Sequence, residues 1–569
     1  MAQTTRKPSL TTKAVNVNTC GEPREEDSPP HNVVGASDLL PVCNVAKIKR
    51  HAHLNTITRL KYKPLYQKII IMFLEVITYA RLMHNSIALA IFLMVFLMVW
   101  SVHRPRGMPP GPRGLPIIGS ILSITQNIHN DFQRLAKKYG DIFAIKLGSQ
   151  QVVVLNNYEL IKEALVINQT DFAGRPNTFT GDMISEGSQF IVLEDYGAIC
   201  RMQRKIVHSA IRAYLSGNSH IEHMVAEDAF PPLQQALEEN DGKVVKPRSL
   251  IFLMVNNIIA QFSYGQKYSL DDPEFKYVMR FMDDVTRIAG SGFVADIIPW
   301  SAYIPTKATS EFKKVTRTFP PFMYKKLEEH KKKFNKDNLD DLFDHLIYAQ
   351  NYTTGSYDLT DARIVQTVAD VFIAGIDTTA HTLDYSMIYL VCYPDVQVKV
   401  AREIDDVVGQ ERLPLISDRP HMPYCDAVIH EIMRIRAVEP LAVPHKAMVD
   451  SSIDGYNIPK GTWLMTNVWA AHMDEKYWEN PELFKPERFL TENGSLKPKQ
   501  DSFFPFSMGR RVCVGESLAK SEIFLLFATL FQRFSFSKVP GKPLPTLDGA
   551  FSFLVLRAPD YEVIVKKRF

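Results

Sequence analysis

One stretch decides the fold, and it reads Phe506-Ser507-Met508-Gly509-Arg510-Arg511-Val512-Cys513-Val514-Gly515-Glu516. Cys513 comes directly before a helix predicted over residues 515–532, and the positive end of a helix lowers the pKa of a thiol. Gly509 and Gly515 permit turns and the close approach of a flat ligand, while Phe506 can pack beside the sulfur. A thiolate held in such a loop is suited to bind a haem iron. The alternative for a lone cysteine is a small buried side chain without chemistry.

The loop matches the pattern F-x-x-G-x-R-x-C-x-G, and with it the sequence resembles the cytochrome P-450 family of haem-thiolate monooxygenases. The resemblance covers residues 109–569 and implies the cytochrome P-450 fold, which is mainly α with small β-sheets. It implies haem b as the cofactor and Cys513 as the iron ligand. Four neighbours of the thiol are implied as further cofactor-binding residues: Phe506, Gly509, Arg511 and Gly515.

Within the family, the chain is most similar to the animal microsomal clan, and there to the steroid 17α-hydroxylase/17,20-lyase group. Most of the stretches that carry this likeness are structural loops: Phe172-Ala-Gly-Arg-Pro176, Ile297-Ile-Pro-Trp300, Ile416-Ser-Asp-Arg419, residues 443–453 and residues 544–549. The resemblance implies that one oxygen atom of dioxygen is inserted into a C–H bond of a lipophilic substrate. We expect that substrate to be a steroid.

A second unusual stretch, Ala374-Gly375-Ile376-Asp377-Thr378-Thr379, lies in the middle of a helix predicted over residues 361–391. Glycine, aspartate and threonine are weak helix formers, so a constraint other than helix stability placed them there. Small-residue packing between helices is one explanation. The resemblance implies another, in which Ala374 and Gly375 leave room over the haem, and Thr378 and Asp377 are catalytic residues that carry protons.

A charged triad is expected on the haem side of the domain. Glu431 and Arg434 stand at i and i+3 on a helix predicted over residues 421–435, so they share one face. Together with Arg488 in Phe484-Lys-Pro-Glu-Arg-Phe489, they resemble the buried structural triad of the family. Without the resemblance, such a pair would be read as a surface salt bridge.

The haem carboxylates need cations, and the resemblance assigns this role to Arg511, His445 and Arg204. The motif around Arg204, Cys200-Arg-Met-Gln-Arg204, departs from the family, which usually has tryptophan at the position of Cys200. A cysteine lacks the indole N–H donor, so we expect one contact to the haem carboxylates to be missing.

The first hundred residues differ from the rest. Residues 1–84 are predicted to be a disordered and basic extension. Residues 85–102 carry no charge and are predicted to form a transmembrane helix, with a buried core helix as the alternative. Residues 103–116 read as a proline-rich hinge, and residues 117–569 as the catalytic domain. By the resemblance, the protein spans the endoplasmic reticulum membrane once and keeps its catalytic domain in the cytosol.

Composition excludes several classes of protein. Hydrophobic residues make up 46% and charged residues 22% of the 569 residues, which is too apolar for a disordered chain. The mean hydropathy of -0.10 excludes a polytopic membrane protein. Six cysteines are too few for a disulfide scaffold. The net charge of +4 is too small to indicate a nucleic-acid partner.

The sequence has no G-x-G-x-x-G unit for a nicotinamide, so the resemblance implies a separate electron donor, NADPH-cytochrome P-450 reductase, with cytochrome b5 as a second candidate. The stretches expected to line the substrate pocket, residues 182–193, 369–375, 438–443 and 550–554, are largely apolar. Such a lining suits a sterol, a fatty acid or a xenobiotic. A hydroxylase of fatty acids or xenobiotics, a haem-thiolate isomerase and a non-catalytic haem sensor are therefore the alternatives.

Overall fold

The protein is described by a computed structural model, which covers residues 68, 71–72, 74–76, 85–101, 104–185, 191–216, 220–290, 292–353, 359–552 and 554–569. Residues 1–90 and residues 91–569 form two compact units. The predicted disordered extension over residues 1–84 lies almost entirely outside the described residues.

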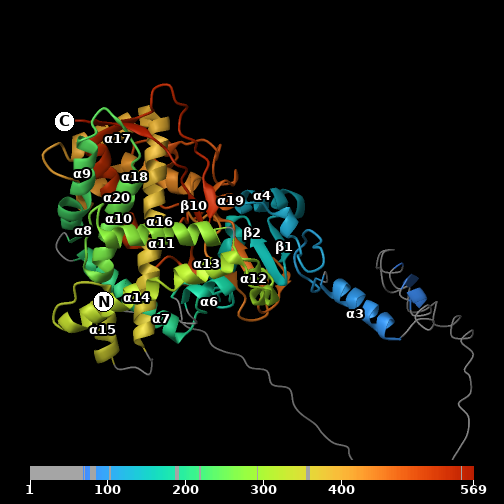
Figure 1. The fold of residues 1–569 in the computed structure, drawn as a ribbon. Coiled ribbons are helices and arrows are strands. Elements are labelled where there is room, and N and C mark those ends of the chain that lie inside the picture. Colours follow the sequence, from blue (N-terminus) through green and yellow to red (C-terminus); the bar gives the residue numbers. More distant parts are fainter. Residues whose placement is uncertain are drawn as a thin grey trace, which may run out of the picture. The chain divides into compact units, whose positions relative to one another are not determined.

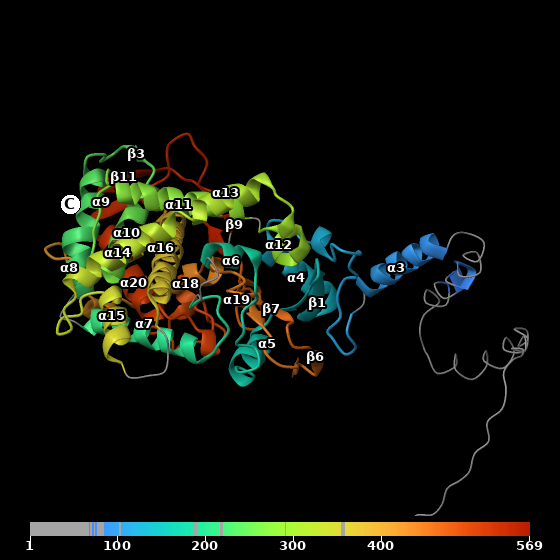
Figure 2. The ribbon, with the colours of Figure 1, turned by 60° about the horizontal axis from the view of Figure 1, so that its bottom comes forward.

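Helices make up most of the larger unit (Figure 1, Figure 2), which confirms the predicted mainly α fold with small sheets. The shorter helices are α5 (Tyr158–Lys162), α6 (Phe179–Ser185), α8 (His220–Met224), α9 (Phe230–Glu238), α12 (Val294–Ile297), α13 (Lys307–Thr316) and α19 (Val468–His472). The longer ones are α4 (Ile128–Tyr139), α7 (Ala198–Ser216), α10 (Arg248–Tyr264), α11 (Pro273–Ala289), α14 (Phe319–Lys333), α15 (Leu342–Tyr352), α16 (Asp361–Cys392), α17 (Pro394–Val407), α18 (Pro423–Ile435) and α20 (Glu516–Arg533).

Helix α16 runs through the middle of this unit, and the ribbon views show α10, α18 and α20 around it (Figure 1, Figure 2). It begins where the Thr360 side chain accepts a hydrogen bond from the Arg363 amide at 3.3 Å, which is an N-cap. It ends at Cys392, shortly before Pro394, because proline lacks the amide that would continue the helix. The middle of a helix surrounded in this way lies inside the protein, where it can line an internal site.

The strands form small sheets at the margins of the helices. The largest has the order β1-β2-β7-β4, in which β2 and β7 are parallel and the other pairs antiparallel. These strands are β1 (Ile142–Leu147), β2 (Gln150–Leu155), β7 (Trp463–Thr466) and β4 (His445–Lys446). Two hairpins pair β5 (Ser451–Ile453) with β6 (Tyr456–Ile458) and β9 (Ala550–Ser552) with β10 (Val555–Arg557).

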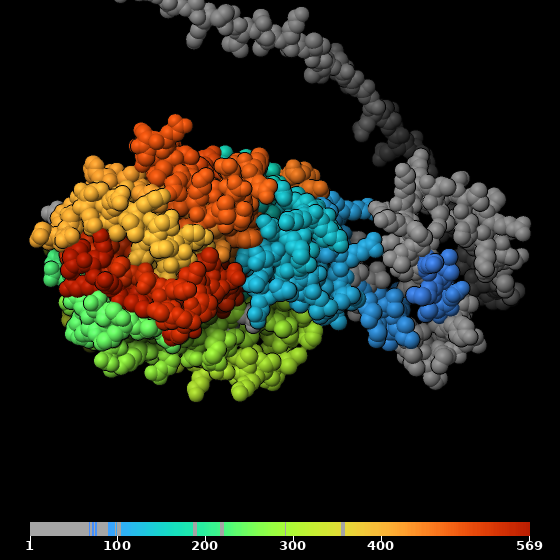
Figure 3. All heavy atoms as spheres, turned by 90° about the horizontal axis from the view of Figure 1, so that it is seen from above, coloured from blue at the N-terminus to red at the C-terminus, as the bar shows by residue number. Residues whose placement is uncertain are grey.

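A three-stranded sheet joins distant parts of the chain. The C-terminal strand β11 (Val563–Lys567) lies between β3 (Val244–Val245) and β8 (Phe534–Ser537). Figure 3 shows the red C-terminal residues beside green residues at the surface, in agreement with this pairing. The end of the chain is thereby tied to the helical core.

The residues that precede β1 were predicted to include a membrane span and a hinge. A helix is present there, α3 (Asn85–Ser101). Among the residues that the structure describes, none of the helices is both long enough and apolar enough to cross a membrane. In the proline-rich segment that follows, Arg104 donates to the carbonyls of Pro109 and Ala144 at 3.0 and 3.1 Å, so this part is held against β1.

Candidate functional site

The loop before α20 is held in a shape that requires glycine. Gly509 has a φ of +73°, and a Cβ at this position would lie 1.7 Å from the Leu165 carbonyl oxygen, so a larger residue does not fit. The Cys513 amide donates to the Phe506 carbonyl at 3.0 Å, which fixes the phenylalanine and the cysteine relative to each other. The structure thus brings Phe506, Gly509 and Cys513 together as the motif suggests.

Cys513 is exposed by its own surface, yet burial raises the pKa of its thiol to about 11, with the charge of Glu439 adding to the effect. Both observations hold if the thiol faces an internal space that is enclosed by protein. The backbone N–H of Gly515 interacts with the sulfur and lowers the pKa, but burial outweighs it. The sequence-based expectation of a lowered pKa is therefore wrong for the haem-free chain. A bound metal reverses the balance, because a coordinating thiol loses its proton.

Ala374 is an exposed residue in a helix most of whose residues are buried. Thr378, one turn later, donates its hydroxyl to the Ala374 carbonyl at 2.7 Å. Gly375 has a different place from the one expected, since a Cβ there would lie 2.9 Å from Ile259 Cδ1 on α10. Ala374 therefore leaves open space beside α16, whereas Gly375 permits the packing of α16 against α10.

A group of basic residues lies near Cys513 and includes the three expected members. Arg511 is buried and donates to Cys200 Sγ at 2.8 Å and to the Val192 carbonyl at 3.1 Å. Arg204, on α7, donates to the Val512 carbonyl. The His445 ring nitrogen Nδ1 lies 2.8 Å from the Phe172 carbonyl oxygen, which accepts only if Nδ1 carries a proton.

Arg175 is a fourth member that the sequence did not single out, although it stands in the quoted stretch from Phe172 to Pro176. It is buried and donates to the carbonyls of Val443 and Pro444 at 2.7 and 2.9 Å. Burial lowers the pKa of its guanidinium, and the charges of Arg511 and Arg204 lower it further. Its contacts are with residues far along the chain, so no local sequence pattern indicates its role. The only hint in the sequence is the presence of an arginine in that loop.

The cationic cluster, defined as Arg175, Arg204 and Arg511, has the neutral His445 beside it and is not neutralised by acidic side chains. Among the described residues, none of its three guanidiniums lies within 4.0 Å of a carboxylate oxygen; the contacts above are to carbonyls and to one sulfur. Guanidinium groups without a counter-ion in a buried place are costly unless an anion binds. An accessible thiol, open space beside Ala374 and unpaired cations fit an iron porphyrin with two carboxylates.

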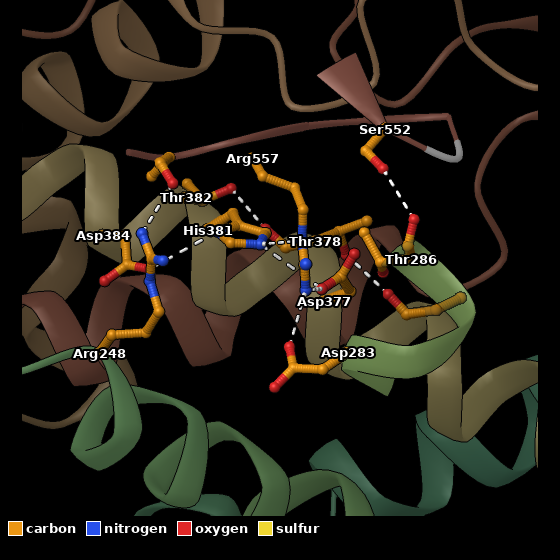
Figure 4. A network of polar contacts seen from close by, with 12 residues as sticks. Arg248, Asp283, Thr286, Asp377, Thr378, His381, Thr382, Asp384, Ser552 and Arg557 are labelled. Carbon is orange, nitrogen blue, oxygen red and sulfur yellow. Dashed lines mark hydrogen bonds and ion pairs between the residues drawn. The ribbon is translucent and has the colours of Figure 1, made fainter. Parts of the chain in front are cut away.

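Asp377 belongs to a polar network that includes His381 and Arg557 (Figure 4). Its Oδ1 lies 3.4 Å from Arg557 Nη2 and 3.5 Å from His381 Nε2. Arg557 also donates from Nε to His381 Nε2 at 3.1 Å, so this ring nitrogen is the acceptor. The same guanidinium lies 3.8 Å from Asp283, whose side chain is 68% exposed. Arg557 therefore connects Asp377 to a carboxylate at the surface.

The predicted triad is formed and buried. Glu431 accepts from Arg434 Nε at 2.7 Å and Nη2 at 2.8 Å, and from Arg488 Nε at 3.0 Å. Arg434 uses its remaining donors on the carbonyls of His472 and Pro481, both at 2.8 Å. Glu431 and Arg434 are fully buried. Every charge in this triad has a partner, which indicates a structural role and not a binding site.

The chain matches the family model described as cytochrome P-450 over residues 109–565. A steroid 17-alpha-hydroxylase/17,20 lyase of Ictalurus punctatus is 38% identical over 469 residues, which cover 81% of this chain and 91% of that protein. One of Squalus acanthias is 37% identical and covers 82% and 92%. A solved structure described as a zebra fish cytochrome P-450 with progesterone has a TM-score of 0.71 and 36% identity, and covers 77% of this chain and 99% of that one.

Proposed function

Since the chain belongs to the cytochrome P-450 family and is a haem-dependent monooxygenase, we propose that it hydroxylates a steroid with dioxygen. The observation that carries the proposal is the accessible Cys513 thiol in the loop before α20, beside a cluster of cations. The steroid is supported by the names of the relatives, which are steroid 17-alpha-hydroxylase/17,20 lyases, and by the progesterone with which the similar zebra fish structure was solved.

Each residue of the site has a role in the proposal. Cys513 would ligate the iron, with Phe506, Gly509 and Gly515 shaping its loop, and the exposed Ala374 would leave room for the haem. The cationic cluster holds the haem carboxylates. When bound, haem supplies the activation of dioxygen for insertion into a C–H bond.

Two residues of α16 are proposed to transfer protons to the site. Thr378 uses its only hydrogen to bond the Ala374 carbonyl, so its oxygen is free to accept a hydrogen bond from a water molecule. Asp377 is one residue away and exchanges protons as a general acid. Arg557 holds the Asp377 carboxylate, and the same guanidinium lies 3.8 Å from the surface carboxylate of Asp283.

The partners and location are part of the same proposal. Electrons come from NADPH through NADPH-cytochrome P-450 reductase, and cytochrome b5 is a further donor. The protein works at the endoplasmic reticulum membrane with its catalytic domain in the cytosol. Carbonate extraction of microsomes checks this placement, since release of the full chain into the supernatant would contradict it.

The test is reconstitution of the purified holoprotein with reductase, NADPH and progesterone, followed by mass spectrometry of the products. We expect a hydroxylated steroid, and we expect Thr378→Ala to lower the product formed per NADPH while haem content stays unchanged. An unaltered product yield in Thr378→Ala would exclude the proton route. NADPH-dependent oxygen consumption without any steroid product would favour a fatty-acid or xenobiotic substrate, and no oxygen consumption would favour an isomerase or a sensor.

A further inference from the structure

Glu439 is an acidic residue in the loop between α18 and β4, a stretch that the sequence marks as largely apolar. The loop is pinned from two sides. The Val438 carbonyl accepts from the Leu556 amide of β10 at 2.7 Å, and the Pro440 carbonyl accepts from the Trp469 amide at 3.0 Å. The backbone on either side of Glu439 is therefore fixed, and its side chain has a defined direction.

The pinned backbone places Glu439 close to the catalytic residues. Leu556 is followed by Arg557, which lies 3.4 Å from Asp377, so the strand that holds Val438 also reaches the centre of α16. On the other side, the loop runs to Val443 and Pro444, whose carbonyls bind Arg175. Glu439 stands between these two attachments, with Asp377 near one and the cationic cluster near the other.

The Glu439 carboxyl has no polar partner among the described residues. It is half-buried, and the part of the chain that the structure describes offers its side-chain oxygens no hydrogen bond or ion pair. Its charge acts on the Cys513 thiol, and the charges of Arg175 and Asp377 act on it. Cys513, Arg175 and Asp377 belong to different elements of the fold. Because the Glu439 carboxyl interacts electrostatically with all three, we infer that it lies at the internal space between these elements.

An enclosed carboxyl without a partner is unfavourable, because the loss of water is not compensated. Burial raises the pKa of Glu439, and Asp377 adds to this while Arg175 opposes it. Burial and the absence of a partner thus favour the uncharged form of this carboxyl, which is a hydrogen-bond donor. An oxygen atom of a ligand bound in this internal space would provide the hydrogen-bond acceptor that the described part of the protein does not offer to Glu439.

We propose that Glu439 determines substrate specificity by donating a hydrogen bond to a ketone or hydroxyl oxygen of an otherwise apolar substrate. This inference rests on the proposed function, because it concerns the substrate pocket of the same monooxygenase. It restricts the substrate class, because lipophilic molecules that carry an oxygen at the matching position bind more tightly than hydrocarbons of the same shape.

The experiment measures equilibrium binding to the purified holoprotein by calorimetry, with haem content checked in every variant. The probes are progesterone and two analogues in which one or the other ketone oxygen is replaced by methylene. In wild type, one analogue binds about tenfold more weakly than progesterone, the effect of one hydrogen bond of about 1.4 kcal/mol. Glu439→Leu weakens progesterone by the same factor and removes the preference, whereas Glu439→Gln keeps most of it through its amide donor.

The exposed Glu475, also a glutamate, provides the matched control, since Glu475→Leu should leave all affinities unchanged. Equal weakening of all three ligands by Glu439→Leu, or no weakening of any, would overturn the inference. A second pair, a long-chain ketone and the alkane of equal length, separates the two proposals. If progesterone does not bind wild type but the ketone preference depends on Glu439, the steroid function fails and the role of Glu439 stands; without that dependence the role of Glu439 fails as well.

Discussion

Two buried groups of arginines in this protein look alike in the sequence and differ in what surrounds them. In the triad, Glu431 binds both Arg434 and Arg488, and the remaining donors of Arg434 meet carbonyls. In the cationic cluster, Arg175 and Arg511 meet carbonyls and a sulfur but no carboxylate within ion-pair distance among the described residues. The triad is complete without a ligand, and the cluster is not. The missing counter-ion of the cationic cluster therefore distinguishes the binding site from the structural triad.

The difference predicts that the two groups respond in opposite ways to haem. Removing a member of the triad strands an opposite charge in the core whether or not haem is present. Removing a member of the cluster relieves repulsion between cations in the haem-free chain and weakens the holoprotein. Stability and haem affinity should therefore separate the two groups experimentally.

Arg434→Ala is expected to have the largest effect. Glu431 would remain buried with one partner fewer, and the free energy of unfolding should fall by about 3–5 kcal/mol. Urea unfolding of the haem-free chain measures the loss, and we expect little protein with haem to be recovered. The matched control is Arg402→Ala, an exposed arginine on α17, which should behave as wild type. A soluble Arg434→Ala with normal haem content would show that the triad does not stabilise the fold.

Arg511→Gln is expected to come next, and to act on haem and not on the fold. Loss of one cation for the haem carboxylates should speed haem transfer to an excess of apomyoglobin at least tenfold, since a charge-assisted hydrogen bond contributes about 1.5–3 kcal/mol. The stability of the haem-free chain should fall less than in Arg434→Ala, because repulsion from Arg175 and Arg204 is relieved. A large loss of stability with unchanged haem release would assign Arg511 to the core.

Residues that act through near neighbours could be predicted from the sequence, and residues that act across the chain could not. Cys513, its glycines and the pair Glu431 and Arg434 each lie within a few residues of their partners, so spacing sufficed. Arg175 reaches a carbonyl 268 residues away, and Arg557 reaches a carboxylate 180 residues away. No local pattern reports such contacts.

The pKa of Cys513 is a second property that could not be predicted from the sequence alone. The helix end next to the thiol is visible in the sequence and favours a thiolate. Enclosure by several distant elements is not visible, and it raises the pKa to about 11. The motif thus singles out Cys513 as the proposed ligand, while the protonation state of its thiol depends on tertiary structure.

A smaller effect, on the pH dependence of stability, should distinguish the cationic cluster from the triad. It depends on the histidine next to each group, His445 beside the cluster and His472 beside the triad. Burial lowers the pKa of His445 well below its usual value, and Arg175 adds to this; burial and Arg434 lower the pKa of His472 to about 3. Between the folded pKa and about 6.5, the unfolded chain binds more protons. Stability is therefore fully present above pH 6.5 and is lost as the pH falls below it.

Unfolding of the haem-free chain between pH 7 and 5 measures this loss for wild type and His445→Gln. The variant should reduce the slope by at most about 1.4 kcal/mol per pH unit, the value for one proton. If the haem carboxylates lie beside His445 as proposed, the contribution of His445 to the slope should be smaller in the holoprotein, whereas the contribution of His472 should not change. Identical slopes in wild type and His445→Gln would mean that His445 is not held neutral by the cluster.

Cys200→Ala should have the smallest effect and tests how the cluster tolerates a cysteine where the family usually has tryptophan. Cys200 is fully buried and accepts from Arg511 Nη1 at 2.8 Å, so the sulfur orients the guanidinium in place of an aromatic ring. Alanine removes the acceptor, and haem transfer should accelerate about fivefold, equivalent to about 1 kcal/mol. Cys200→Ser keeps an acceptor of similar size and should restore most of the retention. If Cys200→Ser released haem as fast as Cys200→Ala, packing and not the hydrogen bond would explain the role of Cys200, and the carbonyls of Val192 and Glu194 would suffice to hold Arg511.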